Sequence, residues 1–253
     1  MSKKIVCVIT EMPEDKFWLP ISIKSYIDWA DAVVIVDGSE GKSAQLLKTI
    51  FSEAELSKIV MIASSYPHDD KGADGKQRNK YLEHLKEYFN GDLAIVVDSD
   101  EVLCDDAKEH FSIIDEFMLK NSLDVYNPRM EHFIDNFSKV DSTHLLHICP
   151  GRVFRISKDL KYTEVEHVSL ISTTDRGLVG AKAVLESPTL YYHYGYTRGR
   201  ETIIRKYNNN LVKSNIHTKE FLDWWKNSHL LGTYPVRTFL GQHPKPVREV
   251  FKL

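Results

Sequence analysis

Hydrophobic positions in the first hundred residues alternate between short continuous runs and longer helical patterns. Continuous runs of aliphatic, mostly β-branched residues predict buried strands at 4–10, 32–36, 59–63 and 93–97. Between these runs, apolar side chains recur at helical spacing, which predicts helices at 17–29, 43–51 and 77–89. This alternation is typical of βαβ units. It therefore predicts an α/β fold whose mostly parallel central sheet carries helices on both faces.

The hydrophobic pattern weakens after residue 105. We expect helices at 107–121, 201–212 and 219–226, and strand-like segments at 124–133, 152–156, 165–171 and 189–194. The tail over 241–253 contains Pro244 and Pro246 and is predicted to be extended. There is no internal repeat and no low-complexity linker, so the second half is expected to continue the same sheet.

An acidic segment follows the fourth apolar run directly. Asp98, Ser99, Asp100 and Glu101 would stand at the carboxyl end of a buried strand, where open α/β sheets bind their ligands. Ionised carboxylates are costly to bury unless they are paired. Mg²⁺ and Mn²⁺ prefer oxygen ligands and commonly bridge to substrate phosphates. The segment therefore indicates either a metal site or, with equal weight, a solvated acidic turn.

Other polar groups are predicted at the same edge of the sheet. Asp37 follows the second apolar run in the turn Asp37-Gly38-Ser39, and Lys76 and Arg78 stand at the head of the 77–89 helix, where phosphate can bind. His193 closes a later strand-like run, and its imidazole could complete a metal shell. For each of these features, an ordinary turn, a solvated loop or a structural histidine is the alternative.

Composition excludes several classes of protein. The 253 residues include 33 Lys and Arg against 36 Asp and Glu, a net charge of −3, which argues against a dedicated nucleic-acid binder. Three widely spaced cysteines form no CxxC motif, the first apolar run is too short for a signal peptide, and no run of about 18 apolar residues occurs. We expect a cytoplasmic protein without a transmembrane segment, or one peripherally attached at the inner face of a membrane. A homodimer is left open.

Taken together, the motifs resemble glycosyltransferase family 2-like enzymes of the GT-A fold. The resemblance covers residues 3–212, and its most specific stretch reads QRNKYLEHLKEYFNGDLAIVVDSDEVL. It implies a GT-A domain at 1–212, with a nucleotide-binding half at 1–105 and an acceptor half at 106–212. Residues 213–253 would form a helical or extended C-terminal extension.

The resemblance also implies a reaction, a donor and a metal. The reaction would be metal-dependent, inverting transfer of a sugar from a UDP- or GDP-linked donor to an acceptor that the sequence does not identify: a glycan, a lipid-linked molecule or a protein. Asp98, Asp100 and His193 would hold Mn²⁺ or Mg²⁺. The implied donor-binding residues are Thr10, Glu11, Asp37, Lys76, Arg78, Asp98, Ser99, Arg198 and Arg200.

An inverting enzyme of this family needs a carboxylate base that deprotonates the acceptor hydroxyl. Glu166 is the favoured candidate, because Val165-Glu166-His167 is similar to the acceptor-side segment of the family, although the usual His-Glu order is inverted here. Glu131 and Asp135 are the alternatives.

Two other functions compete with this interpretation. The segment from Asp98 to Leu103 is similar to the first motif of haloacid-dehalogenase-like phosphatases, in which the first aspartate is the nucleophile; the later acidic motif of that family is not found. The third hypothesis is a non-catalytic nucleotide- or carbohydrate-binding module of the same fold.

Overall fold

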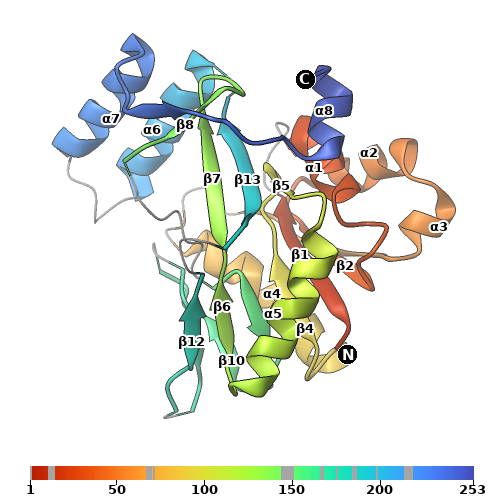
Figure 1. The fold of residues 1–253 in the computed structure, drawn as a ribbon. Helices are drawn as coiled ribbons and strands as arrows, with labels where there is room; N and C mark the ends of the chain where they lie inside the picture. The colour runs from red at the N-terminus through yellow and green to blue at the C-terminus, as the bar shows by residue number, and fades with distance from the viewer. Residues whose placement is uncertain are drawn as a thin grey trace.

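A seven-stranded sheet and a smaller five-stranded sheet organise the chain (Figure 1). The computed structural model describes residues 2–10, 15–66, 70, 72–143, 151–165, 168–174, 176–183, 187–197, 199–213 and 219–253. The helices are α1 (Asp15–Lys24), α2 (Lys42–Ile50), α3 (Glu53–Leu56), α4 (Ala73–Tyr88), α5 (Ala107–Lys120), α6 (Arg200–Lys213), α7 (Lys219–Leu231) and α8 (Lys245–Phe251). The first strands are β1 (Lys4–Thr10), β2 (Ala32–Asp37), β3 (Ile59–Ala63), β4 (Leu93–Val96), β5 (Glu101–Leu103), β6 (Val125–Asn127) and β7 (Arg129–Ile134). The later strands are β8 (Lys139–Asp141), β9 (Val153–Arg155), β10 (Leu160–Tyr162), β11 (Leu170–Ser172), β12 (Gly180–Lys182), β13 (Thr189–Tyr196) and β14 (Val236–Thr238).

The large sheet has the strand order β12-β6-β9-β4-β1-β2-β3. Strands β4, β1, β2 and β3 are parallel to one another, and the β12–β6 pair is also parallel, whereas β9 runs antiparallel to both of its neighbours. The prediction of an α/β fold with a mostly parallel sheet is thus confirmed.

Each face of the large sheet has its own hydrophobic core. Because side chains alternate along a strand, Val6 and Val8 of β1 pack into one core, while Ile5, Cys7 and Ile9 pack into the other. The first core also takes residues of α1, α2 and α5, and the second takes the buried side of α4. Helices therefore cover both faces, as the continuous apolar strand pattern predicts.

The second sheet, with the order β14-β8-β7-β13-β5, was not predicted. The sequence indicated one strand at 124–133, but Pro128 divides it: β6 joins the large sheet and β7 joins the small one. Proline has no N–H to donate to a strand ladder, which explains a break at this position. The second half therefore builds a separate sheet beside the first as well as extending the first.

The C-terminal residues return to the body of the molecule (Figure 1). Strand β14 pairs antiparallel with β8, and α8 buries Val247 completely while its Phe251 ring packs against Trp18 of α1. The prediction of an extended tail over 241–253 was wrong. Pro244 and Pro246 occupy the start of α8, where the backbone N–H groups have no helical partner to lose.

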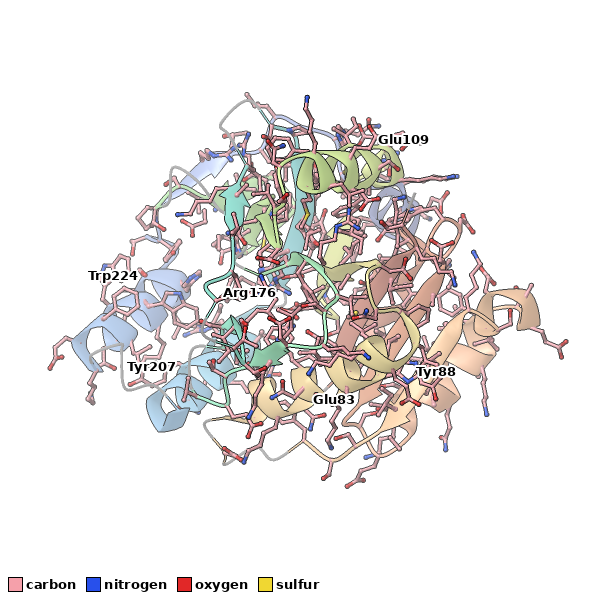
Figure 2. The ribbon with its side chains drawn as sticks, turned by 90° about the horizontal axis from the view of Figure 1, so that it is seen from below. Glu83, Tyr88, Glu109, Arg176, Tyr207 and Trp224 are labelled. Atoms are coloured by element: carbon pink, nitrogen blue, oxygen red, sulfur yellow. The ribbon has the colours of Figure 1, made fainter. Side chains whose placement is uncertain are left out.

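Helices α6 and α7 pack together beside β7 and β13, on the side of the molecule away from α2 and α3 (Figure 1). Figure 2 shows Trp224 of α7 and Tyr207 of α6 at this margin. No helix within the described ranges is long and apolar enough to cross a membrane.

Candidate active site

A cavity of about 670 Å³ opens at the carboxyl end of β4, between the two sheets. Its charged and polar wall includes Arg78, Asp98, Glu101, Arg152 and His193. Other parts of the wall come from β6, from β7 and from the segment around β10 and β11. Five separate parts of the chain therefore meet around the acidic segment at 98–101.

Asp98 is held by two guanidinium groups. Arg78 Nη2 donates to Asp98 Oδ1 at 2.8 Å, and Arg152 Nη2 donates to Asp98 Oδ2 at 2.7 Å. The same Arg152 nitrogen lies 2.8 Å from Glu101 Oε1, while the backbone N–H of Asp98 donates to Glu101 Oε2 at 2.7 Å. Two carboxyl groups and two guanidinium groups thus form one compact cluster, in which hydrogen bonds fix each member.

The cluster shifts the pKa values of its two carboxyl groups in opposite directions. Burial by itself would raise the pKa of Asp98, but Arg152 and Arg78 outweigh burial and hold that pKa well below its usual range. Burial raises the pKa of Glu101, which Arg152 only partly opposes and which the neighbouring Asp98 raises further. Of the two carboxyl groups, Asp98 is therefore the one that stays ionised.

Asp100 faces a pair of histidines. His193 Nε2 lies 3.5 Å from Asp100 Oδ1, and His193 Nδ1 shares a 2.9 Å hydrogen bond with Nδ1 of His132. The pairing of β13 with β7 sets His193 directly opposite His132. Asp100 and His193 are consequently a carboxylate and an imidazole that could hold one divalent cation between them.

The described side chains supply few metal ligands at this position. Among the described residues, no three His, Cys, Asp or Glu side chains come together as a metal-binding group. Of the three predicted ligands, Asp98 has both oxygens hydrogen-bonded to arginines, which leaves Asp100 and His193. Such a pair fits Mg²⁺ or Mn²⁺ that also takes ligands from a bound diphosphate.

Asp37 lies in a different environment at the end of β2. It is 3% exposed, and its Oδ1 accepts from the Thr10 hydroxyl at 3.1 Å and from the Ser39 N–H at 2.9 Å. Its Oδ2 accepts from the N–H of Ala44 in the first turn of α2, at 3.4 Å. Asp37 therefore ties the carboxyl ends of β1 and β2 to the N-terminus of α2.

Helix α4 begins at Ala73, four residues before the predicted start, and its glycines allow a close contact. A Cβ atom on Gly75 would lie 2.0 Å from the carbonyl oxygen of Thr163, and one on Gly72 would lie 2.5 Å from that of Glu164. The chain between β10 and β11 thus packs directly on the first turn of α4. Glu166 belongs to this connection, and its described residues Val168 and Ser169 line the cavity.

The other predicted residues are dispersed. Lys76 is exposed and pairs with Asp70, and Arg200 is exposed at the start of α6. Both oxygens of Glu131 accept from Arg237 Nη2 at 2.6 Å; along β7, Glu131 alternates with Met130 and His132, which line the cavity. Asp135 follows β7 with a φ of 62° and lies outside the described lining.

Three predicted residues, Glu11, Glu166 and Arg198, lie outside the described residues. Thr10 and Ser99 are both buried, Thr10 beside Asp37 and Ser99 between the two aspartates of the acidic segment.

Sequence reasoning assigned no role to several residues of the cavity wall, among them Arg152, His132 and Tyr196. Arg152 comes just before β9, whose antiparallel pairing with β4 carries it to Asp98. Burial of the acidic segment requires a cationic partner, but the sequence does not indicate which arginine supplies it.

Comparisons with known proteins find similarity of fold. No family model and no curated protein matches the chain. Among solved structures, residues 1–349 of S. aureus TarS align over 91% of this chain and 71% of that chain, with 16% identity and a TM-score of 0.47. The same TarS fragment in complex with UDP-GlcNAc gives the same coverage and identity with a TM-score of 0.43. A 4-diphosphocytidyl-2C-methyl-D-erythritol synthase aligns over 62% of this chain and 76% of that chain, with 14% identity and a TM-score of 0.39. These likenesses concern the fold, and the activity has to be argued from the side chains.

Proposed function

We propose that the protein is a divalent-metal-dependent glycosyltransferase that takes a sugar from a nucleoside diphosphate donor and inverts its anomeric centre. The observation that carries the proposal is the set of groups around the cavity at the end of β4. Asp98, Asp100 and Glu101 meet Arg78, Arg152 and His193 there. Such a combination of fixed cations and acids suits a diphosphate bound together with a metal.

The charges of the cavity favour a metal with the donor. Its described charged lining comprises Arg78 and Arg152 against Asp74, Asp98 and Glu101, and Asp100 stands beside it. Taken as fully ionised, this group carries no net positive charge that could attract a diphosphate. A divalent cation held by Asp100 and His193 would supply that charge and act as a Lewis acid on the leaving group.

Side chains of the protein would bind and orient the donor. Arg78 and Arg152, fixed by Asp98, would orient the diphosphate and stabilise the charge that it gains as the glycosidic bond breaks. The nucleoside would lie toward Thr10 and Asp37, and Ser99 would contact the donor beside Asp98. We propose that the outer part of the nucleotide-sugar donor is contacted by Glu11, Lys76, Arg198 and Arg200.

The acceptor hydroxyl attacks the anomeric carbon as the bond to the diphosphate breaks, and its proton passes to a carboxylate. We propose Glu166 as this base, because the segment that carries it packs on α4 and contributes Ser169 to the cavity wall. Glu131 is a weaker candidate, since Arg237 occupies both of its oxygens. Asp135 is weaker because it stands outside the described lining.

The phosphatase alternative gains nothing from this geometry. A nucleophilic aspartate needs an oxygen directed at its substrate, but both oxygens of Asp98 accept hydrogen bonds from arginine. A non-catalytic binding module differs from the proposed enzyme only in turnover, so it is distinguished by assay.

The first test is thermal stabilisation by UDP, GDP and their sugar conjugates, each with Mn²⁺, Mg²⁺ or chelator. A ligand at 100 times its dissociation constant should add about 2.7 kcal/mol to the free energy of unfolding. We expect stabilisation by one nucleotide class that falls sharply on chelation.

Two carboxylate variants make this test specific. Asp100→Asn should abolish the metal-dependent part of the shift. Asp106→Asn, which removes an exposed carboxylate that pairs with His110 and is not part of the cavity lining, should leave it unchanged. Full metal-dependent stabilisation of Asp100→Asn would refute the metal site, and a chain that no nucleotide stabilises would refute the function.

The base is tested separately. Glu166→Gln should lose transfer activity by at least about 100-fold, the usual contribution of a general base, while donor binding is retained. Glu131→Gln serves as the comparison. A larger loss of turnover in Glu131→Gln, with binding intact, would transfer the role to Glu131.

A further inference from the structure

His193 and His132 face each other on two neighbouring strands of the small sheet. Strands β13 and β7 run parallel and side by side (Figure 1), and their register sets His193 opposite His132. Side chains at opposite positions of paired strands point to the same face of a sheet. Both rings accordingly line the cavity, and their Nδ1 atoms lie 2.9 Å apart.

The residues that follow the two histidines hold these strands from the other face of the sheet. Phe133, next to His132, is fully buried and stacks on Tyr194, next to His193, with ring centroids 4.7 Å apart. Tyr194 also stacks on Trp18 of α1 at 4.7 Å. Packing away from the cavity therefore fixes the backbone at both histidines, and a change of the His132 side chain should leave that backbone in place.

The contact between the two rings needs one proton and one lone pair. In a neutral imidazole, one nitrogen carries the proton and the other accepts. Either His193 Nδ1 donates to His132 Nδ1, or His132 Nδ1 donates to His193 Nδ1. The direction also determines the second nitrogen of His193, because Nε2 has a lone pair in the first arrangement and a proton in the second.

The second nitrogen of His193 is the one beside Asp100. Its Nε2 lies 3.5 Å from Asp100 Oδ1, farther than the roughly 2.7–3.2 Å of an N–H···O hydrogen bond. A proton on Nε2 would be poorly placed to bond Asp100 and would prevent this nitrogen from binding a metal. A lone pair on Nε2 leaves an imidazole nitrogen and a carboxylate oxygen as two ligands for one cation. Only the first arrangement therefore suits a metal site.

We propose that His132 is a positioning residue, whose Nδ1 accepts from His193 Nδ1–H and so presents the lone pair of His193 Nε2 to a divalent cation beside Asp100. The inference rests on the proposed function, to which that cation belongs. A histidine that binds a metal commonly donates its other ring N–H to a carboxylate or a carbonyl group, and removing such a partner typically lowers metal affinity about 10- to 100-fold. Here a second imidazole takes that place.

The first experiment measures Mn²⁺ affinity by electron paramagnetic resonance, without nucleotide and with UDP or GDP. His132→Leu removes the acceptor, and we expect at least tenfold weaker Mn²⁺ binding. His132→Asn places an amide oxygen at the position of Nδ1 and should recover most of the affinity. His110→Leu is the matched control, because His110 pairs with Asp106 on α5 and is not part of the cavity lining. This control should bind Mn²⁺ as the unchanged chain does.

A second measurement locates the proton in the unchanged chain. Nitrogen chemical shifts measured by NMR distinguish a ring nitrogen that carries a proton from one that does not. With Mg²⁺ bound, we expect protons on His193 Nδ1 and on His132 Nε2. This result does not depend on whether a His132 variant folds.

Four results would overturn the proposal: unchanged Mn²⁺ affinity in His132→Leu, equal losses in folded His132→Leu and His132→Asn, a proton on His132 Nδ1 in the Mg²⁺-bound chain, or no Mn²⁺ binding with or without nucleotide. Thermal unfolding checks that each variant is folded. None of these readouts requires turnover. The proposed function fails by a different result, the absence of stabilisation by any nucleotide, so the two failures are distinguishable.

Discussion

Two aspartates at the carboxyl end of the same sheet have opposite surroundings. Asp37 follows β2 and is almost completely buried among hydroxyl and backbone N–H donors. Asp98 follows β4, its side chain is 30% exposed at a cavity, and two arginines neutralise it. Both have an apolar strand before them and a small residue after them, so the difference arises from what the rest of the chain brings to each.

A position at the carboxyl edge of the sheet makes an aspartate a candidate site residue. Its hydrogen-bond and ion-pair partners then determine what it can do. Around Asp37 the donors come from its own turn, from β1 and from α2, all within the first 44 residues. Around Asp98 the partners include Arg152, 54 residues away along the chain. The hydrogen-bond partners of Asp37 are all local, whereas Asp98, with a distant arginine as partner, faces a cavity.

Removing Arg152 should have the largest effect. Arg152→Leu would leave Asp98 and the buried Glu101 without their shared cation, and breaking a buried ion pair from one side costs about 3–5 kcal/mol. Urea unfolding measures this loss, and nucleotide binding should be lost with it. Arg152→Lys, which keeps the charge, should recover part of the stability. A loss below about 1 kcal/mol in Arg152→Leu would show that the cluster does not stabilise the Asp98 end.

Closing the space at Gly75 should come next. Gly75→Ala would place a methyl group 2.0 Å from the Thr163 carbonyl oxygen, and backbone of this kind cannot rotate away. We expect a loss of about 3 kcal/mol, at the upper end for overpacking, together with weaker ligand binding, because the shifted segment lines the cavity. Gly177→Ala is the control, since no atom lies within 4 Å of its added Cβ. Equal stability of the two variants would mean that this contact does not shape the Asp98 cavity.

A smaller effect is expected at Asp37. Asp37→Asn replaces an acceptor oxygen by a donor among groups that all donate, which should lower the free energy of unfolding by about 1–2 kcal/mol. Nucleotide affinity should change less than in Asp98→Asn, as measured by titration calorimetry. Loss of affinity at full stability would show instead that Asp37 contacts the nucleoside directly.

The smallest effect is a change in pH dependence. Because the pKa of Asp98 is lower in the folded protein than in the unfolded chain, its ionised form stabilises the fold above the unfolded pKa of about 3.9. That contribution begins to decrease below about pH 5 and is lost as the pH falls further, through the lowered pKa of the folded protein. As the pH is lowered from about 5, the free energy of unfolding should therefore decrease less in Asp98→Asn than in the unchanged chain. Parallel declines would contradict the assigned pairing with Arg78 and Arg152.

Much of the first half could be predicted from the sequence. The runs at 4–10, 32–36, 59–63 and 93–97 correspond to β1 to β4, because strands buried on both faces need continuous apolar residues. The acidic segment after β4 was recognised for the same reason, as charge that directly follows a buried run. These signals are local, and each is complete within about ten residues.

The sequence alone determined the parallel βαβ core, the edge of the sheet at which the cavity lies and the residues Arg78, Asp98, Asp100 and His193 as candidates. Only the tertiary structure decided that Arg152 neutralises Asp98, that Arg237 occupies Glu131, and that Trp224 faces solvent while Trp225 packs against Tyr196. The physical reason is the distance along the chain over which each feature is determined. Burial and periodicity are recorded in neighbouring residues, whereas the partner of a charge depends on how strands distant in sequence pair. That pairing follows from the packing of the whole chain.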